Sequence, residues 1–260
     1  MISEDFIKNW LVNTNWQTDN QAEQDLIISR ALVCLYNDND IRNNLVFRGG
    51  TALNKLFLKP PARYSEDIDF VQLKPGPIGL IIDKIRALLN PWLSSMKWKI
   101  TERGAKLIYP YQSVDGSIAK LKIEINTTEH FQVLPLQFEP FSFKSNWFEG
   151  ACEIITYQLV ELMATKLRAL YQRRKGRDLF DIWYVFKDNL VDIGQVLDIF
   201  QRYCFKDGII ISKELFLKNM ELKKLNEDFR VDMKTLLPLN IKWDFEVSFN
   251  FVINKIIDNI

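Results

Sequence analysis

The sequence has few of the residues that build thiolate, disulfide or histidine-based sites. Its 260 residues contain one histidine and three cysteines, and the cysteines are far apart and form no C-x-x-C pair. Such cysteine usage argues against a disulfide framework and a zinc ribbon, and it fits a reducing cytoplasm. The single histidine, His130, excludes histidine-based metal centres and phosphohydrolases of the HD type.

Several other signals are missing as well. No apolar run approaches the ~18 residues that a membrane-spanning helix needs, and the early acidic N-terminus is unlike a signal peptide. We therefore expect a cytoplasmic protein without membrane contact. No G-x-x-x-x-G-K-[ST] pattern is present, which excludes a P-loop enzyme. The net charge is +1, so only a local basic patch, and not bulk charge, would attract nucleic acid.

The remaining composition is that of a globular protein, with 47% hydrophobic and 26% charged residues. Hydrophobic periodicity predicts an α+β fold in two parts. Residues 1–150 form a mixed sheet with flanking and N-terminal helices, and residues 151–260 form a helical C-terminal domain. The expected elements are helices over 21–38, 51–58, 77–93, 156–174 and 177–189, strands over 45–48, 67–73 and 117–126, a hairpin within 96–111, and an irregular or edge strand within 130–147.

A pair of aspartates stands out in the segment DIDFV. Asp67 and Asp69 are two residues apart on a predicted strand, so both side chains point to the same face. Two adjacent carboxylates repel each other unless a cation or a proton lies between them. Such a pair suits Mg²⁺, which binds through one or two carboxylates plus substrate phosphates. Taken alone, a D-x-D pattern is also common at a solvated strand edge.

The segment FRGGT precedes this pair and predicts a turn between a strand and a helix. Gly49 and Gly50 allow the backbone to approach a ligand closely, and Thr51 opens a helix whose free N–H groups favour an anion. Ser65 adds a hydroxyl near the aspartates. A strand–helix turn can be purely structural, but phosphate at the glycines and metal at the aspartates together describe a nucleoside triphosphate site.

A third acid follows in the segment KLKIEIN. Glu124 lies on the polar face of an alternating strand, where it can join Asp67 and Asp69. The same pattern also fits an exposed strand face of lysine and glutamate.

A second charged cluster lies in the segment KLRALYQRRKGRDLFD. Lys166 lies at the rim of an apolar stripe, and Asp178 and Asp181 share one helix face. Asp178 can instead cap its helix, with Gly176 ending the helix before it. The basic residues of the predicted loop 173–175 suit either a solvated surface or a nucleic-acid backbone.

These blocks, in this order, resemble the AbiEii/AbiGii toxin family of nucleotidyltransferases, within the DNA-polymerase-β-like superfamily. The resemblance covers residues 45–183. It implies a toxin of a bacterial toxin–antitoxin or abortive-infection system, with Mg²⁺ or Mn²⁺ as cofactor. It also implies a nucleoside triphosphate substrate, an RNA acceptor such as tRNA, and a cognate antitoxin.

The resemblance also assigns roles to residues of this chain. It implies metal binding by Asp67, Asp69 and, less firmly, Glu124. The implied catalytic residues are Asp67, Asp69, Lys166, Asp178 and Asp181. The implied nucleotide-binding residues are Gly49, Gly50, Thr51, Ser65 and Arg177. Two alternatives stay open, which are a nucleotide-binding toxin or regulator without turnover, and a transferase acting on a protein or a small molecule.

Overall fold

The computed structural model describes residues 2–260, which divide into two compact units. The first unit runs to Tyr157 and includes Pro238–Asn240, and the second is Gln158–Leu237 with Ile241–Ile260. The division expected at Gly150 falls inside a strand, and the units separate after Tyr157. The α+β class, with a mixed sheet followed by a helical region, is confirmed.

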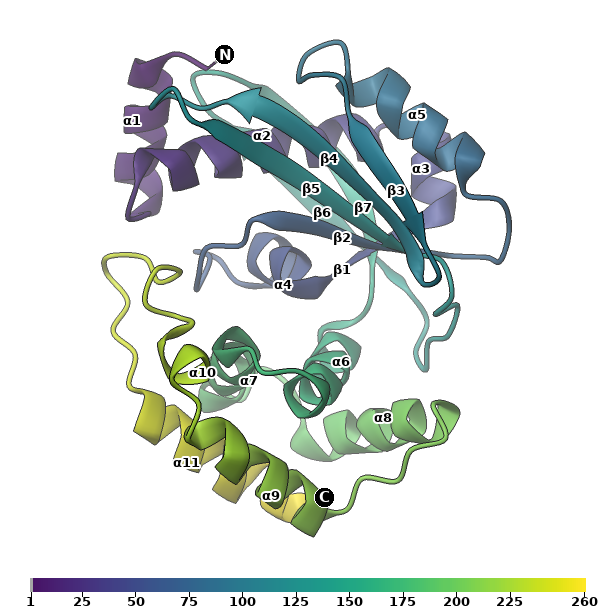
Figure 1. The fold of residues 1–260 in the computed structure, drawn as a ribbon, viewed down its shortest axis with the longest axis vertical. Helices are drawn as coiled ribbons and strands as arrows, with labels where there is room; N and C mark the ends of the chain where they lie inside the picture. Colours follow the sequence, from purple (N-terminus) through teal and green to yellow (C-terminus); the bar gives the residue numbers. More distant parts are fainter. Residues whose placement is uncertain (1) are drawn as a thin grey trace. The chain divides into compact units, whose positions relative to one another are not determined.

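The first unit is built on a seven-stranded mixed sheet with the strand order β3-β4-β5-β2-β1-β7-β6 (Figure 1). Its strands are β1 (Leu45–Arg48), β2 (Asp67–Gln72), β3 (Lys97–Thr101), β4 (Gly104–Gln112), β5 (Ile118–Asn126), β6 (Gln137–Lys144) and β7 (Glu149–Thr156). Its helices are α1 (Glu4–Thr14), α2 (Asp19–Tyr36), α3 (Asn39–Asn44), α4 (Gly49–Ala52), the π-helical η1 (Leu53–Phe57) and α5 (Gly79–Leu89).

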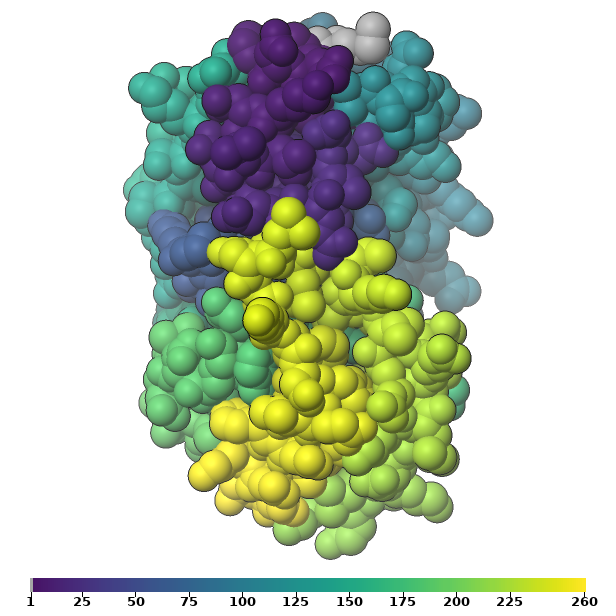
Figure 2. All heavy atoms as spheres, turned by 90° about the vertical axis from the view of Figure 1, so that its left-hand side faces the viewer, coloured from purple at the N-terminus to yellow at the C-terminus, as the bar shows by residue number. Residues whose placement is uncertain are grey.

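The two faces of this sheet differ in chemistry. On β5, the side chains of Leu121, Ile123 and Ile125 are buried, while the alternate residues are partly or fully exposed. The buried face packs against helices, since α2 passes behind the sheet (Figure 1) and the Tyr109 hydroxyl on β4 donates to the Ile85 carbonyl on α5 (Gly79–Leu89). The N-terminal helix α1 forms part of the outer surface of this unit (Figure 2). The other face of β5 is therefore free to carry polar groups.

The chain turns directly from β1 into a helix at the glycines. The helix α4 begins at Gly49, two residues earlier than the start predicted at Thr51, because the extended Arg48 serves as its N-cap residue. The helix continues as the π-helical η1 to Phe57 and then ends before Pro60. The backbone N–H groups that the first helical turn leaves free therefore start with that of Gly49.

The remaining strand predictions are mostly confirmed. The hairpin around Arg103 is present, with Thr101 paired to Gly104 across β3 and β4. The edge strand expected between 130 and 147 is β6. The strand β7 was not predicted, because its sequence alternates weakly and adjoins the strongly helical segment that follows.

The second unit is helical. It contains α6 (Leu159–Gln172), α7 (Gly176–Lys187), α8 (Ile193–Lys206), α9 (Lys213–Lys224), α10 (Glu227–Val231), α11 (Phe245–Lys255) and the short 3-10 helix η2 (Ile257–Asn259). The apolar stripe predicted for the first of these helices is buried at Met163, Leu167 and Leu170. No helix within residues 2–260 is both long and apolar enough to cross a membrane.

Candidate active site

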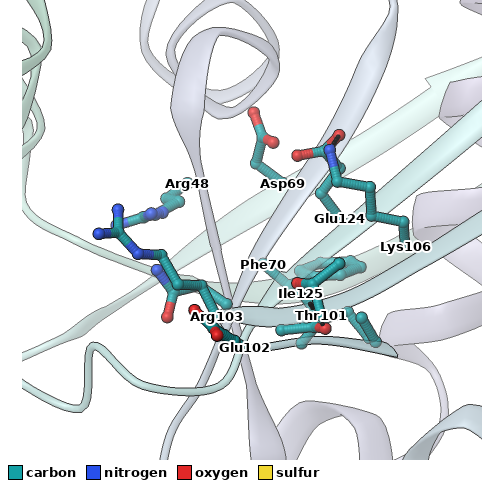
Figure 3. Close-up of a pocket in the computed structure, with 12 residues that line it drawn as sticks. Arg48, Asp69, Phe70, Thr101, Glu102, Arg103, Lys106, Glu124 and Ile125 are labelled. Atoms are coloured by element: carbon teal, nitrogen blue, oxygen red, sulfur yellow. Dashed lines mark hydrogen bonds and ion pairs between the residues drawn. The ribbon is translucent and has the colours of Figure 1, made fainter. Parts of the chain in front are cut away.

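The three acids of the first unit lie side by side on the open face of the sheet. In the parallel pairing of β2 with β5, Asp67 is opposite Lys122 and Asp69 is opposite Glu124. On the other side of β2, Asp69 is opposite Arg48. The predicted placement of Glu124 beside the aspartates is therefore confirmed, and Figure 3 shows the Asp69 and Glu124 carboxylates projecting to the same side of their strands.

Asp67 is held in a partly desolvated position. Burial raises the pKa of its carboxyl to about 6, with Lys122 opposing this shift and Glu66 and Asp69 adding to it. Its Oδ1 atom is buried and accepts no hydrogen bond from any residue the structure describes, although Lys122 Nζ lies 3.4 Å away. A buried carboxylate oxygen without a hydrogen bond is rare, so this atom is suited to accept a cation.

The residues present fit a metal ion bound by two carboxylates rather than by three. Within residues 2–260, no group of three Asp, Glu, His or Cys side chains is arranged to hold a metal ion. Asp67 and Asp69 offer oxygen ligands on one strand face, which is the donor type that Mg²⁺ prefers. The Glu124 carboxylate instead forms an ion pair with Lys106, whose Nζ lies 2.9 Å from Oε1. The role of Glu124 as a metal ligand stays a prediction.

The glycine turn is packed against the second aspartate. Gly49 has a φ of +82°, in the left-handed region, and a Cβ atom placed on it would lie 2.3 Å from Asp69 Oδ2. A Cβ atom on Gly50 would lie 2.3 Å from Arg63 Nη2. Arg63 is buried, so its guanidinium places a positive charge directly against the turn. Both glycines are thus required by close packing, and the turn brings backbone and cation together next to Asp69.

Thr51 and Ser65 link this turn to β2. The Thr51 and Ser65 hydroxyl oxygens are 2.7 Å apart, and the Thr51 hydroxyl also donates to the Asp67 carbonyl. Thr51 is buried and Ser65 is half-buried. The hydroxyl of Thr51 therefore fixes the turn relative to the aspartates, and its predicted nucleotide contact would be made by the backbone. The predicted contact of Ser65 is not tested by this geometry.

A cleft of about 560 Å³ opens beside Asp69 and Glu124 (Figure 3). Eight of the twelve residues that line it are charged or polar, and they include Arg48, Arg103 and Lys106. The Arg48 guanidinium is fixed by Glu129, with 2.7 Å between Nη1 and Oε2. Acidic and basic side chains thus face one cavity, which Asp69 lines and to which Asp67 and the glycine turn do not contribute.

The second predicted cluster lies in the other unit and is a buried ion-pair network. Lys166 Nζ is 3.1 Å from Asp178 Oδ1 and 2.8 Å from Asp181 Oδ2, and all three side chains are at least 93% buried. Burial alone would raise the pKa of Asp178, but Lys166 and Arg173 outweigh it and hold that pKa well below its usual range. The structure therefore brings together these three predicted residues, and their catalytic roles stay predictions.

Two expectations about this region are corrected. Asp178 does not cap α7, because the helix begins at Gly176 and the Asp178 carboxylate binds side chains instead. At the start of the same helix the backbone N–H of Arg177 donates to Asp232 Oδ2 at 3.0 Å, and the contact of Arg177 with the nucleotide stays a prediction. Arg173 lies on the predicted loop, but its Nε is 2.7 Å from Asp178 Oδ2. It is thus part of the buried network rather than a freely solvated base.

Sequence reasoning assigned no role to several side chains of the site. Arg48 directly precedes the glycines, so its position offered a signal that was not used. The sequence pattern alone could not have shown the other three basic residues, which are Lys106, Lys122 and Arg63. Their contacts with the site depend on the register of the strands and on packing between distant segments.

Solved structures of other proteins share this fold. MenT4, a nucleotidyltransferase toxin of Mycobacterium tuberculosis, is similar with a TM-score of 0.74 and 16% identity, covering 100% of this chain and 91% of that one. JHP933 of Helicobacter pylori has a TM-score of 0.57 and 20% identity, covering 93% of both chains. At these identities the likeness shows the fold alone.

The family is shown by the sequence itself. No curated protein matches the chain at a significant level. The family model described as "Nucleotidyl transferase AbiEii toxin, Type IV TA system" matches residues 30–250, which is most of the chain. The chain therefore belongs to the AbiEii family of nucleotidyltransferase toxins of type IV toxin–antitoxin systems.

Proposed function

We propose that this nucleotidyltransferase uses Mg²⁺ (or Mn²⁺) to move a nucleotide from a nucleoside triphosphate to an RNA acceptor, with tRNA as the expected RNA. Its family implies the triphosphate substrate and a cognate antitoxin. The observation that carries the proposal is the close packing of the glycine turn on the acid pair, where a Cβ atom placed on Gly49 would lie 2.3 Å from Asp69 Oδ2. A phosphate at the turn would therefore be adjacent to carboxylates suited to a cation.

Asp67 and Asp69 would hold the metal, which supplies charge neutralisation on the transferred phosphate and on the leaving pyrophosphate. With a pKa of about 6, the Asp67 carboxyl is mostly ionised at neutral pH and is available as a ligand. Glu124 would join them only after its ion pair with Lys106 opens.

The other groups of the first unit bind and orient the triphosphate. The backbone N–H groups of the turn that begins at Gly49 would bind a phosphate oxygen of the triphosphate. The buried guanidinium of Arg63, which packs against Gly50, adds positive charge to this turn. In the transfer step the acceptor hydroxyl oxygen bonds to the α-phosphorus and the bond to pyrophosphate breaks. The hydroxyl proton leaves to a base or to solvent.

The predicted residues of the second unit keep their roles in this proposal. Lys166 neutralises phosphate charge, Arg177 contacts the nucleotide, and Asp178 and Asp181 position the acceptor or orient Lys166. The ion pairs of Lys166 with both aspartates support the orienting role, because each carboxylate lies within 3.1 Å of its ammonium.

One incubation tests the proposal against its alternatives. The protein is mixed with each α-labelled nucleoside triphosphate, with total RNA or total protein, and with Mg²⁺ or a chelator. Label in RNA that requires the metal supports the proposal, and the same protein with Asp69→Asn serves as the inactive control. Label in protein or in a small molecule would identify another acceptor, and binding of triphosphate without any transfer would favour the regulator without turnover.

A further inference from the structure

Five lysines share the open sheet face with the acids of the first unit. We call the following set the lysine face: Lys97 and Lys99 on β3, Lys106 on β4, and Lys120 and Lys122 on β5. The register places Lys99 opposite Lys106 and Lys106 opposite Glu124, which is itself opposite Asp69. Since directly paired residues point to the same side of a sheet, one continuous row runs from Asp69 to the edge strand.

The positive charge on this face is only partly balanced. Lys106 pairs with Glu124 and Lys122 pairs with Asp67, at the end of the face nearest the aspartates. The three other lysines of the face are exposed and form no ion pair with any residue between 2 and 260; they are Lys97, Lys99 and Lys120. The residues that alternate with these lysines, such as Trp98, Leu107 and Leu121, are apolar and point to the other side of the sheet, so the charge gathers on one face.

The geometry of the sheet gives this face a direction. The order β2-β5-β4-β3 puts three strand spacings between the aspartates and the outermost lysines, or about 14 Å. A metal-bound triphosphate at Asp67 and Asp69 would occupy one end of this distance. Lys97 and Lys99 at the other end are placed for a longer polyanion.

Protection of an exposed sheet edge does not account for the whole set. Lysines on an edge strand commonly prevent strand-to-strand aggregation, which is a sufficient reason for Lys97 and Lys99 on β3. Lys120 lies on β5 and pairs with β4 on one side, while the pairing of β5 with β2 begins only at Lys122. On that side the Lys120 carbonyl accepts a hydrogen bond from the Gln24 side chain, so the strand edge is already covered and Lys120 calls for another explanation.

We propose that the lysine face binds the phosphate backbone of the RNA acceptor and leads its reacting end to Asp67 and Asp69. The inference rests on the proposed transfer to RNA and adds where the acceptor lies. Charge complementarity selects the occupant, because ammonium groups without carboxylate partners bind phosphates by releasing counterions from the nucleic acid.

The test replaces the three unpaired lysines, as Lys97→Gln, Lys99→Gln and Lys120→Gln in one protein. The control replaces three exposed lysines of the same unit that lie outside the sheet, as Lys8→Gln, Lys59→Gln and Lys74→Gln. Both variants lose the same charge. Binding of a mixed tRNA preparation is measured by fluorescence anisotropy over a series of salt concentrations, and binding of Mg²⁺ with each nucleoside triphosphate is measured in parallel.

We expect the lysine-face variant to bind tRNA more weakly, with a log–log salt slope smaller by about 2, because each lost phosphate contact removes about 0.7–0.9. The control should keep the wild-type slope, and both variants should bind triphosphate normally. Equal slopes in the two variants would overturn the inference, as would a wild-type protein that binds no tRNA. Transfer is read separately, so failure of nucleotide transfer alongside an intact difference in tRNA binding would sink the proposed function and leave the binding surface standing.

Discussion

Replacing Asp67 with asparagine should make the folded protein more stable at alkaline pH while removing transfer. Burial raises the pKa of this carboxyl from 3.8 to about 6, so the folded protein binds the proton more tightly than the unfolded chain does. The contribution of Asp67 to stability is therefore most favourable below pH 3.8 and becomes unfavourable as the pH rises through about 6. Asparagine has the same shape and carries no charge at any pH.

The magnitude follows from the size of the shift. A rise of about 2 pKa units corresponds to about 3 kcal/mol at 1.36 kcal/mol per unit. The Asp67 side chain is 29% exposed, so solvent screening reduces this figure. We expect Asp67→Asn to raise the free energy of unfolding by about 1–3 kcal/mol at pH 8 and to leave it nearly unchanged at pH 3.5.

Urea unfolding of both proteins at the two pH values measures this difference. Asp115→Asn is the control with the opposite sign, because hydrogen bonds from Asn20 and Ser117 lower the pKa of Asp115 to about 2. That variant should lose stability at pH 8. Added Mg²⁺ should raise the unfolding free energy of the wild type and have little effect on Asp67→Asn. A destabilised Asp67→Asn protein at pH 8 would refute the reasoning.

Three further changes probe other parts of the account. Gly49→Ala should lower the unfolding free energy by about 1–2 kcal/mol, because φ is +82° there and the new Cβ meets Asp69. The same change should cut the rate of transfer more than tenfold. Gly79→Ala is the control, because the space around Gly79 is open, and it should change neither stability nor transfer. An alanine at 49 with normal transfer would show that the turn plays no part in catalysis. Lys166→Met should cost about 3–5 kcal/mol by urea unfolding, because Asp178 and Asp181 are left as buried charges, and wild-type stability would contradict the ion-pair network. Arg173→Ala should destabilise the protein, and the loss should be greatest above about pH 4, where the Asp178 carboxyl is ionised in the unfolded chain as well. The double variant Arg174→Ala with Lys175→Ala is the control and should keep the wild-type stability. Equal unfolding curves for the two variants would show that Arg173 is not part of the network.

The site on the sheet was predictable because its signals are local. Alternation along DIDFV places Asp67 and Asp69 on one face, and alternation along KLKIEIN does the same for Glu124. Gly49 and Gly50 mark a turn because few other residues tolerate such close packing. These features depend on neighbouring residues in the chain, which the sequence displays directly.

The partners of these residues were not predictable, since they depend on contacts between distant segments. Lys106 meets Glu124 only through the register of β4 with β5. Arg173 was placed on a solvated loop, because nothing in the local pattern shows that the Asp178 carboxylate lies within its reach. The start of α4 at Gly49 was missed for a different reason, since glycine is a poor helix former and packing decides the matter here.

Metal-dependent transfer of a labelled nucleotide to RNA is the measurement that tests the central claim most directly. The wild-type protein, its Asp69→Asn variant and the lysine-face variant are compared with each α-labelled triphosphate, total RNA, and Mg²⁺ or a chelator. The account predicts labelled RNA from the wild type with Mg²⁺. It predicts at least a thousandfold less from Asp69→Asn, on the order expected when several kcal/mol of metal-mediated stabilisation is lost. Labelling of RNA at the wild-type rate by Asp69→Asn, or in the presence of the chelator, would contradict it.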